Sequence, residues 1–130
     1  MSDFNYSNGI INVGLDSEYF DSNEERYVIT LTSSDKVIGN IMVSYKIVDK
    51  FLANIQYELV REARGNGYMI QALELLWEPL IEKGLSKPYI SVDPENIPSV
   101  RTIEKFGGKK IDNDDWFDTY EVDLQEGHRK

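Results

Sequence analysis

A segment with two glycines, Arg64-Gly65-Asn66-Gly67-Tyr68-Met69, has the residue types of a phosphate-binding turn. It lies between an alternating run predicted to be a strand and an apolar-striped run predicted to be a helix. The glycines let the backbone turn sharply and bring N–H groups close to a ligand, and the helix start adds partial positive charge. The segment predicts a phosphate cradle, with Arg64 as a full positive charge; an ordinary tight connection would use the same glycines.

Two common phosphate motifs are excluded by spacing. A dinucleotide fingerprint needs a third small residue where this chain has Ile70. A P-loop needs a lysine followed by serine or threonine, and Asn66-Gly67-Tyr68 lacks both.

A second segment with polar side chains at fixed spacing runs from Asp93 to Gly108. Asn96 is predicted to cap a helix, and Ser99 follows three residues later in its first turn. The apolar residues Val100, Ile103 and Phe106 have helical spacing, and Gly107-Gly108 is predicted to end the helix.

With both segments in this order, and a strand predicted over 88–92 between them, the chain resembles the GNAT superfamily of acetyl-CoA-dependent N-acetyltransferases. The first segment matches the signature Arg/Gln-x-x-Gly-x-Gly/Ala as Arg64, Gly67 and Met69. The second matches the Asn-x-x-Ser pattern of ribosomal-protein and small-molecule acetyltransferases as Asn96 and Ser99. The resemblance covers residues from about 27 to 124.

The resemblance implies acetyl-CoA as cofactor and a set of residues around it. Asn96 would hydrogen-bond the pantetheine arm, near Ser99, while Arg101 and Lys105 could approach the adenosine phosphates or form a solvated helix face. The backbone of the central strand would lie beside the pantetheine at Leu59, Val60 and Arg61. The pyrophosphate would be surrounded by Arg64, Gly65, Asn66, Gly67, Tyr68 and Met69, where Met69 adds bulk to a position usually held by glycine or alanine.

Acyl transfer to an amine also needs a base, an oxyanion site and a proton donor. Glu58 is the candidate base, and we expect it to be partly buried with a raised pKa; an exposed or salt-bridged glutamate is the alternative. Gln56 would orient a water or the acceptor, and a backbone N–H near Leu59 would bind the oxyanion. Many relatives place a tyrosine donor where this chain has Ile103, so the candidate donors are Ser99, Tyr120 and Tyr57.

The predicted fold class is α/β (α+β), a GNAT-like mixed, mostly antiparallel sheet with a splayed central strand pair and flanking helices, in a single domain over 1–130. The helix after Gly67 is expected to kink at Pro79 or to break near Glu78, and to be capped by Gly84. The predicted strands are Gly9–Leu15, Arg26–Thr32, Val37–Ile47, Leu52–Val60, Pro88–Val92, Lys109–Ile111 and Trp116–Leu124.

The two ends of the chain carry the weakest patterns. Residues 1–25 form a variable segment too short for the two helices with which many relatives wall the acceptor pocket. The acidic run from Asp112 to Asp115 misses the calcium-loop pattern and predicts a solvated turn, so no metal site is expected. The tail 125–130, with the single His128, is expected to be disordered.

Composition restricts location and partners. The chain has 130 residues, 23 acidic against 14 basic side chains, a net charge of −9 and no cysteine. This balance argues against nucleic acid and favours a cationic acceptor, and no apolar run predicts membrane insertion. We expect a cytoplasmic protein that acts on a small-molecule or peptide amine; a homodimer is possible in principle.

Three functions are compatible with the sequence. The first is an N-acetyltransferase that moves an acetyl group from acetyl-CoA to a primary amine. The second is a non-catalytic acyl-CoA-binding or regulatory module, suggested by Ile103 and the short N-terminal segment. The third, a structural protein with an acidic interaction surface, rests on net charge alone.

Overall fold

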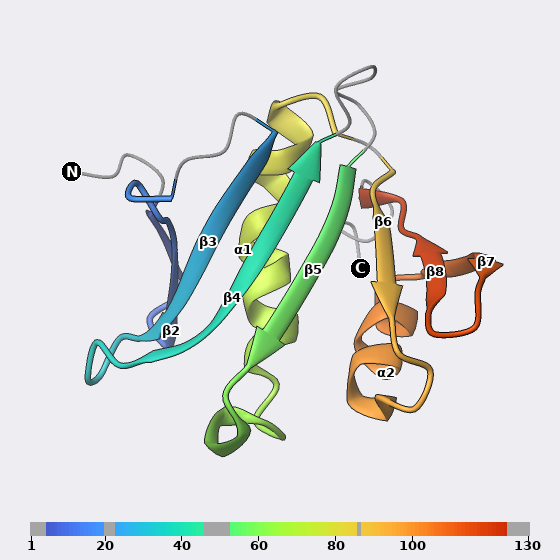
Figure 1. The fold of residues 1–130 in the computed structure, drawn as a ribbon. Helices are drawn as coiled ribbons and strands as arrows, with labels where there is room; N and C mark the ends of the chain where they lie inside the picture. The colour runs from blue at the N-terminus through green and yellow to red at the C-terminus, as the bar shows by residue number, and fades with distance from the viewer. Residues whose placement is uncertain (1–4, 20–22, 46–52, 86, 125–130) are drawn as a thin grey trace.

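The computed structural model describes residues 5–19, 23–45, 53–85 and 87–124, which form a mixed α/β fold around one eight-stranded sheet (Figure 1). The strand order is β1-β2-β3-β4-β5-β6-β8-β7, and only the β5–β6 pair is parallel among the described strands. The predicted mostly antiparallel sheet with flanking helices is therefore confirmed. The elements are β1 Asn5–Ser7, β2 Ile11–Leu15, β3 Glu24–Leu31, β4 Val37–Tyr45, β5 Ala53–Leu59, η1 Arg61–Ala63, α1 Tyr68–Glu82, β6 Tyr89–Val92, α2 Ile97–Lys105, β7 Lys109–Asn113 and β8 Asp118–Glu121.

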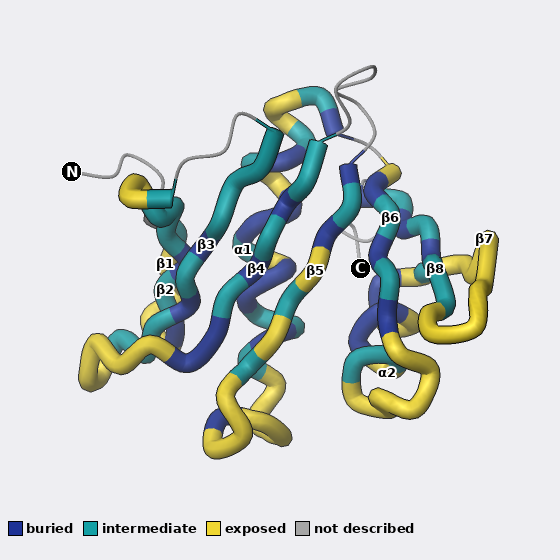
Figure 2. The backbone as a smooth tube through the Cα atoms, in the orientation of Figure 1, coloured by how far each residue is buried: buried dark blue, intermediate teal, exposed yellow. Residues whose placement is uncertain are grey.

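Helix α1 covers one face of the sheet because its apolar stripe matches the inward side chains of the strands. Leu73, Leu76 and Leu80 are fully buried, as are the alternating residues Ile41 and Ile55 of β4 and β5. Figure 2 shows buried segments along α1 and these strands, with exposed segments where β5 and α2 meet their loops. The core thus fixes β4 and β5 against α1.

The ends of α1 follow the prediction, and of the two alternatives predicted for its interior, a kink at Pro79 or a break near Glu78, the structure excludes the break. Gly84 has φ 98° and its N–H bonds to Ile81 O at 2.9 Å, as expected for a glycine that ends a helix. The predicted break near Glu78 is wrong, because α1 continues through Pro79 to Glu82. An interior proline costs about 3 kcal/mol, and burying two large side chains such as Trp77 and Leu80 contributes about as much or more.

The N-terminal part contains a hairpin, and the sequence predicted one of its two strands. Ile11–Leu15 is a strand as predicted, and β1 beside it was missed. The chain then passes from β2 to β3 in eight residues, 16–23, and in the described part of this connection there is no helix. The face of β3, β4 and β5 opposite α1, which is toward the viewer in Figure 1, is consequently not covered by a described helix.

The acidic run at the end of β7 forms the predicted turn only in its second half, because Asp112 and Asn113 still belong to β7. Asp114 Oδ1 accepts hydrogen bonds from the N–H groups of Trp116 and Phe117, both at 2.7 Å, and these bonds lower the pKa of the Asp114 carboxyl. Residues 112–117 are exposed, and within the described ranges no group of acidic or histidine side chains could hold a metal ion. Leu52, the strand end at 46–47 and the tail with His128 lie outside the described residues.

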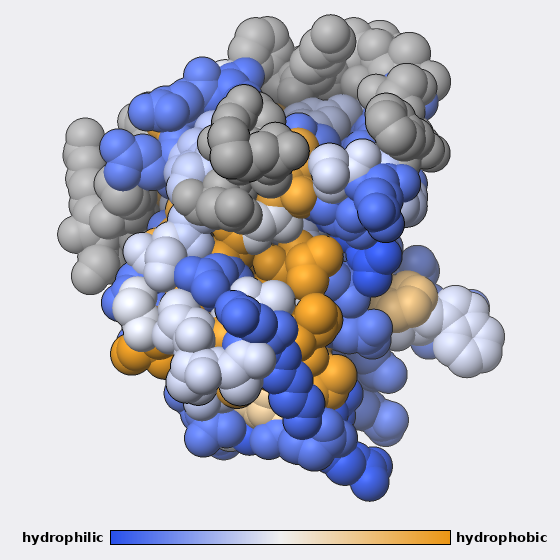
Figure 3. Space-filling model, turned by 90° about the vertical axis from the view of Figure 1, so that its left-hand side faces the viewer, coloured by the Kyte–Doolittle hydropathy of each residue, from blue (hydrophilic) through white to orange (hydrophobic). Residues whose placement is uncertain are grey.

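Hydrophobic side chains also reach the surface near the β1–β2 edge of the sheet. Figure 3 views the molecule from that side and shows a hydrophobic patch bordered by hydrophilic side chains. Such patches are common at protein interfaces, and the homodimer stays a prediction. Neither described helix has the length and apolar character that would let it cross a bilayer.

A polar cluster ties the C-terminal end of α1 to β3 and β4. The Glu25 carboxylate accepts hydrogen bonds from Lys83 Nζ and Tyr45 Oη, both at 2.6 Å, and from Tyr27 Oη at 3.2 Å. Burial raises the pKa of Glu25, but the hydrogen bonds from Lys83 and Tyr45 outweigh it, so the pKa lies below its usual value. Burial also raises the pKa values of Tyr27 and Tyr45.

The lowered pKa of Glu25 predicts a loss of stability in acid. The carboxylate stabilises the fold above its unfolded-state pKa of about 4.3, and this contribution is lost as the pH falls through the lower native pKa. Glu25→Gln should cost about 1–3 kcal/mol at pH 7 and should flatten the acid side of the stability profile. Urea unfolding from neutral to acid pH, with exposed Glu18→Gln as control, measures this; an unchanged acid slope in Glu25→Gln would contradict it.

Candidate active site

The sheet splits between β5 and β6. The two strands pair only at Asn54 with Tyr89 and at Ile55 with Ile90, whereas β6 pairs with β8 along its whole length. Beyond Ile55 the end of β5 therefore faces an opening, not a neighbouring strand. This is the predicted splayed strand pair.

Backbone polar groups of β5 point into the opening. The N–H of Val60 bonds to Ile38 O at 2.8 Å, which makes these two residues a hydrogen-bonded pair of the antiparallel β4–β5 ladder. Because such pairs alternate along a ladder, the N–H and C=O groups of Leu59 and Tyr57 point away from β4. The split thus presents strand-edge donors and acceptors to a ligand.

The loop after β5 forms the predicted glycine turn before α1, and its role as a phosphate cradle stays a prediction. Gly65 and Gly67 have φ values of 82° and 74°, a region that favours glycine, and α1 begins at Tyr68. Arg64 Nε donates to Leu59 O at 3.1 Å, and Asn66 Nδ2 donates to Ala63 O at 3.2 Å. These two side chains fold the loop back toward the end of β5.

A cleft of about 670 Å³ lies between this loop and α2. It brings together eight of the residues predicted to bind the cofactor, and also Arg101 and Lys105. The lining residues are Tyr57, Glu58, Leu59, Arg64, Gly65, Gly67, Tyr68, Met69, Ile70, Asn96, Pro98, Ser99, Arg101, Thr102 and Lys105. We call it the basic cleft, because three of these side chains are cationic.

Three predicted cofactor residues do not line the basic cleft. Val60 and Arg61 border a neighbouring hollow of about 300 Å³ on the uncovered face. The side chain of Asn66 donates hydrogen bonds to Ala63 O and Arg64 O within the loop. Thr102, which the sequence did not single out, is buried in the cleft wall, where its Oγ1 donates to Pro98 O at 2.9 Å.

The start of α2 is held as predicted. Asn96 Oδ1 accepts the N–H of Ser99 at 3.4 Å, so the amide group Nδ2 stays available as a donor. Ile103, at 1% exposure, is packed in the core and does not line the basic cleft. The position at which many relatives carry a tyrosine thus has a structural role here.

A second cleft, of about 590 Å³, opens on the uncovered face of the sheet. It shares four residues with the basic cleft: Tyr57, Glu58, Asn96 and Ser99. We call it the acidic cleft; its lining residues are Asn40, Met42, Asn54, Gln56, Tyr57, Glu58, Ser91, Val92, Asp93, Asn96, Ser99 and Phe117. Gln56 lies there as predicted, and Phe117, which the sequence offered as part of an interface or an acceptor wall, lines this cleft. Asn54 and Asp93 were missed because no local pattern marks them.

Glu58 lies where the two clefts meet, but the expectation that it is partly buried is wrong. The side chain is exposed, because it points to the sheet face that has no described helix over it. Its position beside both clefts leaves it accessible to a substrate and to water.

Tyr57 is the buried hydroxyl of the site. It lines both clefts, its Oη donates to Ser99 O at 3.1 Å, and burial raises its pKa to about 12. Tyr120, by contrast, is 8% exposed in the core, pairs with Ile90 and lines neither cleft. Of the predicted donors, only Tyr57 and Ser99 lie at the junction of the clefts.

The conformation of the cradle predicts which substitutions Gly67 tolerates. A Cβ at Gly67 would have no atom within 4 Å, so a substitution acts through the backbone conformation alone. Gly67→Ala should cost about 1–2 kcal/mol in unfolding free energy, and Gly67→Asn less, since asparagine adopts positive φ more readily. Urea unfolding measures both, and equal stability of Gly67→Ala and the parent would contradict the assigned turn.

Comparison with known proteins gives one family. A family model described as an acetyltransferase (GNAT) domain matches residues 9–109. No curated protein sequence matches the chain significantly.

Solved structures share the fold at low identity. A putative ribosomal-protein-serine acetyltransferase from Vibrio cholerae superposes with a TM-score of 0.76 at 13% identity, over 95% of this chain and 99% of that one. A spermidine N-acetyltransferase SpeG chimera from Vibrio cholerae and hSSAT gives 0.68 at 16%, over 85% and 72%. RimL, a ribosomal L7/L12 alpha-N-protein acetyltransferase in complex with coenzyme A, gives 0.69 at 17%, over 80% and 64%.

Proposed function

The chain belongs to the GNAT acetyltransferase family, and we propose that it transfers an acetyl group from acetyl-CoA to a primary amine. The observation that carries the proposal is the junction of the two clefts at the split in the sheet, where Tyr57, Glu58 and Ser99 line both. One cleft would hold the acetyl donor and the other the amine.

The basic cleft fits coenzyme A by its donors and charges. The backbone groups of Tyr57 and Leu59 offer a strand edge to the pantetheine arm, and the N–H groups of the glycine turn at the start of α1 suit a pyrophosphate. Arg64, Arg101 and Lys105 supply positive charge to the phosphates. Asn96 can donate through Nδ2 to a carbonyl oxygen of the pantetheine arm.

The residues at the junction supply what the reaction needs. The amine nitrogen forms a bond to the acetyl carbon, the carbon–sulfur bond breaks, and one proton moves from the amine to the thiol. An alkylamine has a pKa of about 10.4, so few molecules are neutral at pH 7 and a base raises the reactive fraction. Exposed Glu58 would accept the proton that the amine loses, directly or through a water.

Backbone and hydroxyl donors would stabilise the charges that develop. An N–H at Leu59 or Tyr57 directed into the split would bind the oxyanion. Tyr57 keeps its proton at neutral pH because burial raises its pKa to about 12, so its Oη could donate to the leaving thiolate in place of Ser99 O. Ser99 is the second candidate for that donor.

Relatives suggest the range of acceptors. SpeG is a spermidine N-acetyltransferase and RimL is an alpha-N-protein acetyltransferase. We propose a small-molecule or peptide amine as the acceptor of this chain as well. A cytoplasmic location belongs to the same proposal. The alternative is a non-catalytic acyl-CoA-binding module, which the buried Ile103 at the usual tyrosine position favours.

The test is release of free thiol from acetyl-CoA in the presence of a panel of amines. We expect amine-dependent release, and Glu58→Gln should lower kcat/KM about 10²-fold or more with little change in acetyl-CoA affinity. Glu62→Gln, an exposed change of the same kind outside both clefts, serves as control. Binding of acetyl-CoA by calorimetry without any thiol release would favour the non-catalytic module, and absence of binding would exclude both.

A further inference from the structure

Charge is divided between the two clefts. The cationic residues of the basic cleft are Arg64, Arg101 and Lys105, and its single carboxylate is Glu58. The acidic cleft is lined by Glu58 and Asp93, and none of its described lining residues is a lysine or arginine. Arg26, Arg61 and Arg64 border the neighbouring hollow beside Glu58, so the Asp93 side of the cleft is where the described charged lining is acidic alone.

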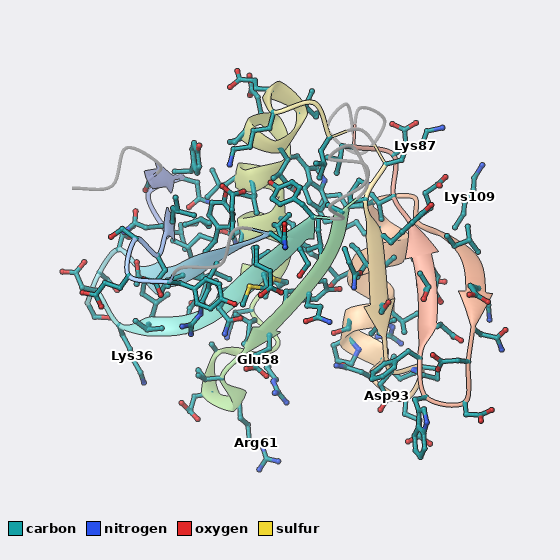
Figure 4. All side chains as sticks on the ribbon, turned by 45° about the horizontal axis from the view of Figure 1, so that its top comes forward. Lys36, Glu58, Arg61, Lys87, Asp93 and Lys109 are labelled. Carbon is teal, nitrogen blue, oxygen red and sulfur yellow. The ribbon has the colours of Figure 1, made fainter. Side chains whose placement is uncertain are left out.

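The two carboxylates lie on opposite walls of the opening. Glu58 is near the end of β5 and Asp93 directly follows β6, and Figure 4 shows them on the two sides of the split at the same end of the sheet. Asp93 Oδ1 accepts the N–H of Glu95 at 2.9 Å, which orients the carboxylate, and its other oxygen can accept a further hydrogen bond.

A buried acceptor atom gives an independent indication of the ligand. Asn54 lines the acidic cleft, and its Oδ1 is buried and has no hydrogen-bond partner among the described residues. A buried oxygen in this state is costly unless a donor reaches it. Ligand N–H groups would supply that donor.

An aromatic ring completes the wall. Phe117 lines the acidic cleft at 48% exposure, and the turn formed by Asp114 holds its backbone. A ring face attracts a cation and also packs against an alkyl chain. The cleft thus combines carboxylates, a carbonyl oxygen and a ring, a set that suits an alkyl chain with positively charged groups.

Resting on the proposed function, we infer that the acceptor is a dication: a primary amine that carries a second positively charged group. The reacting amine lies at Glu58, next to the junction of the clefts, and the second charge lies at Asp93. An acceptor with a carboxylate in place of the second cation is disfavoured, because that carboxylate would face Asp93, and no described lining residue of the acidic cleft is a cation.

The test compares three linear probes of one chain length: cadaverine, pentylamine and 5-aminovalerate. Each is titrated by calorimetry into protein saturated with coenzyme A, so that no turnover occurs. Cadaverine should bind about two- to fivefold more tightly than pentylamine, as one added exposed ion pair allows, and 5-aminovalerate should bind weakest. Equal affinities, or no binding of cadaverine, would overturn the inference.

Matched variants assign the preference to Asp93. Asp93→Asn should remove the advantage of cadaverine while pentylamine binding stays the same. Asp115→Asn removes one charge in the exposed turn outside the cleft and should change neither affinity. The inference is wrong if both variants behave alike.

A calorimetric titration with coenzyme A alone, made before the probes are added, separates a failure of the proposed function from a failure of the dication inference. If coenzyme A binds and the diamine preference is missing, only the dication inference fails. If coenzyme A does not bind, the proposed function fails and the inference fails with it.

Discussion

The short pairing between β5 and β6 is the constraint on which the site depends. Two residue pairs join the strands, and the backbone groups of Tyr57 and Leu59 then face an opening. The opening stays because each wall is fixed by its own packing: β5 lies on α1, while β6 pairs with β8 and contacts α2. Besides the strand pairing, the Trp77–Phe106 ring contact at 5.2 Å and the hydrogen bond from Tyr57 Oη to Ser99 O join the walls.

This arrangement places opposite charges on the two sides of one junction. The loop after β5 and the exposed side of α2 contribute arginine and lysine, and the uncovered sheet face contributes carboxylates. An anionic donor and a cationic acceptor would then meet from opposite directions at Glu58 and Tyr57. The short β2–β3 connection matters here, since the face that presents Glu58 has no described helix over it.

Local sequence patterns predicted the parts of the site that depend on local backbone preferences. The glycine turn, the Asn96 cap and the alternating strands follow from backbone preferences, and the structure has all three. The continuation of α1 through Pro79 and the burial of Tyr120 depend on tertiary packing and strand register, which no local pattern contains. Asn54 and Asp93 in the acidic cleft were missed for the same reason, because they come from separate parts of the chain.

The central claim is that the split strand edge receives the pantetheine arm, and amide hydrogen exchange read by NMR tests it most directly. If the pantetheine arm binds there, coenzyme A should slow exchange at the amides of Tyr57 and Leu59, which face the opening. The amides of Gln56 and Glu58 face β4 and should change little. Unchanged exchange at Tyr57 and Leu59 in protein saturated with coenzyme A would contradict the account.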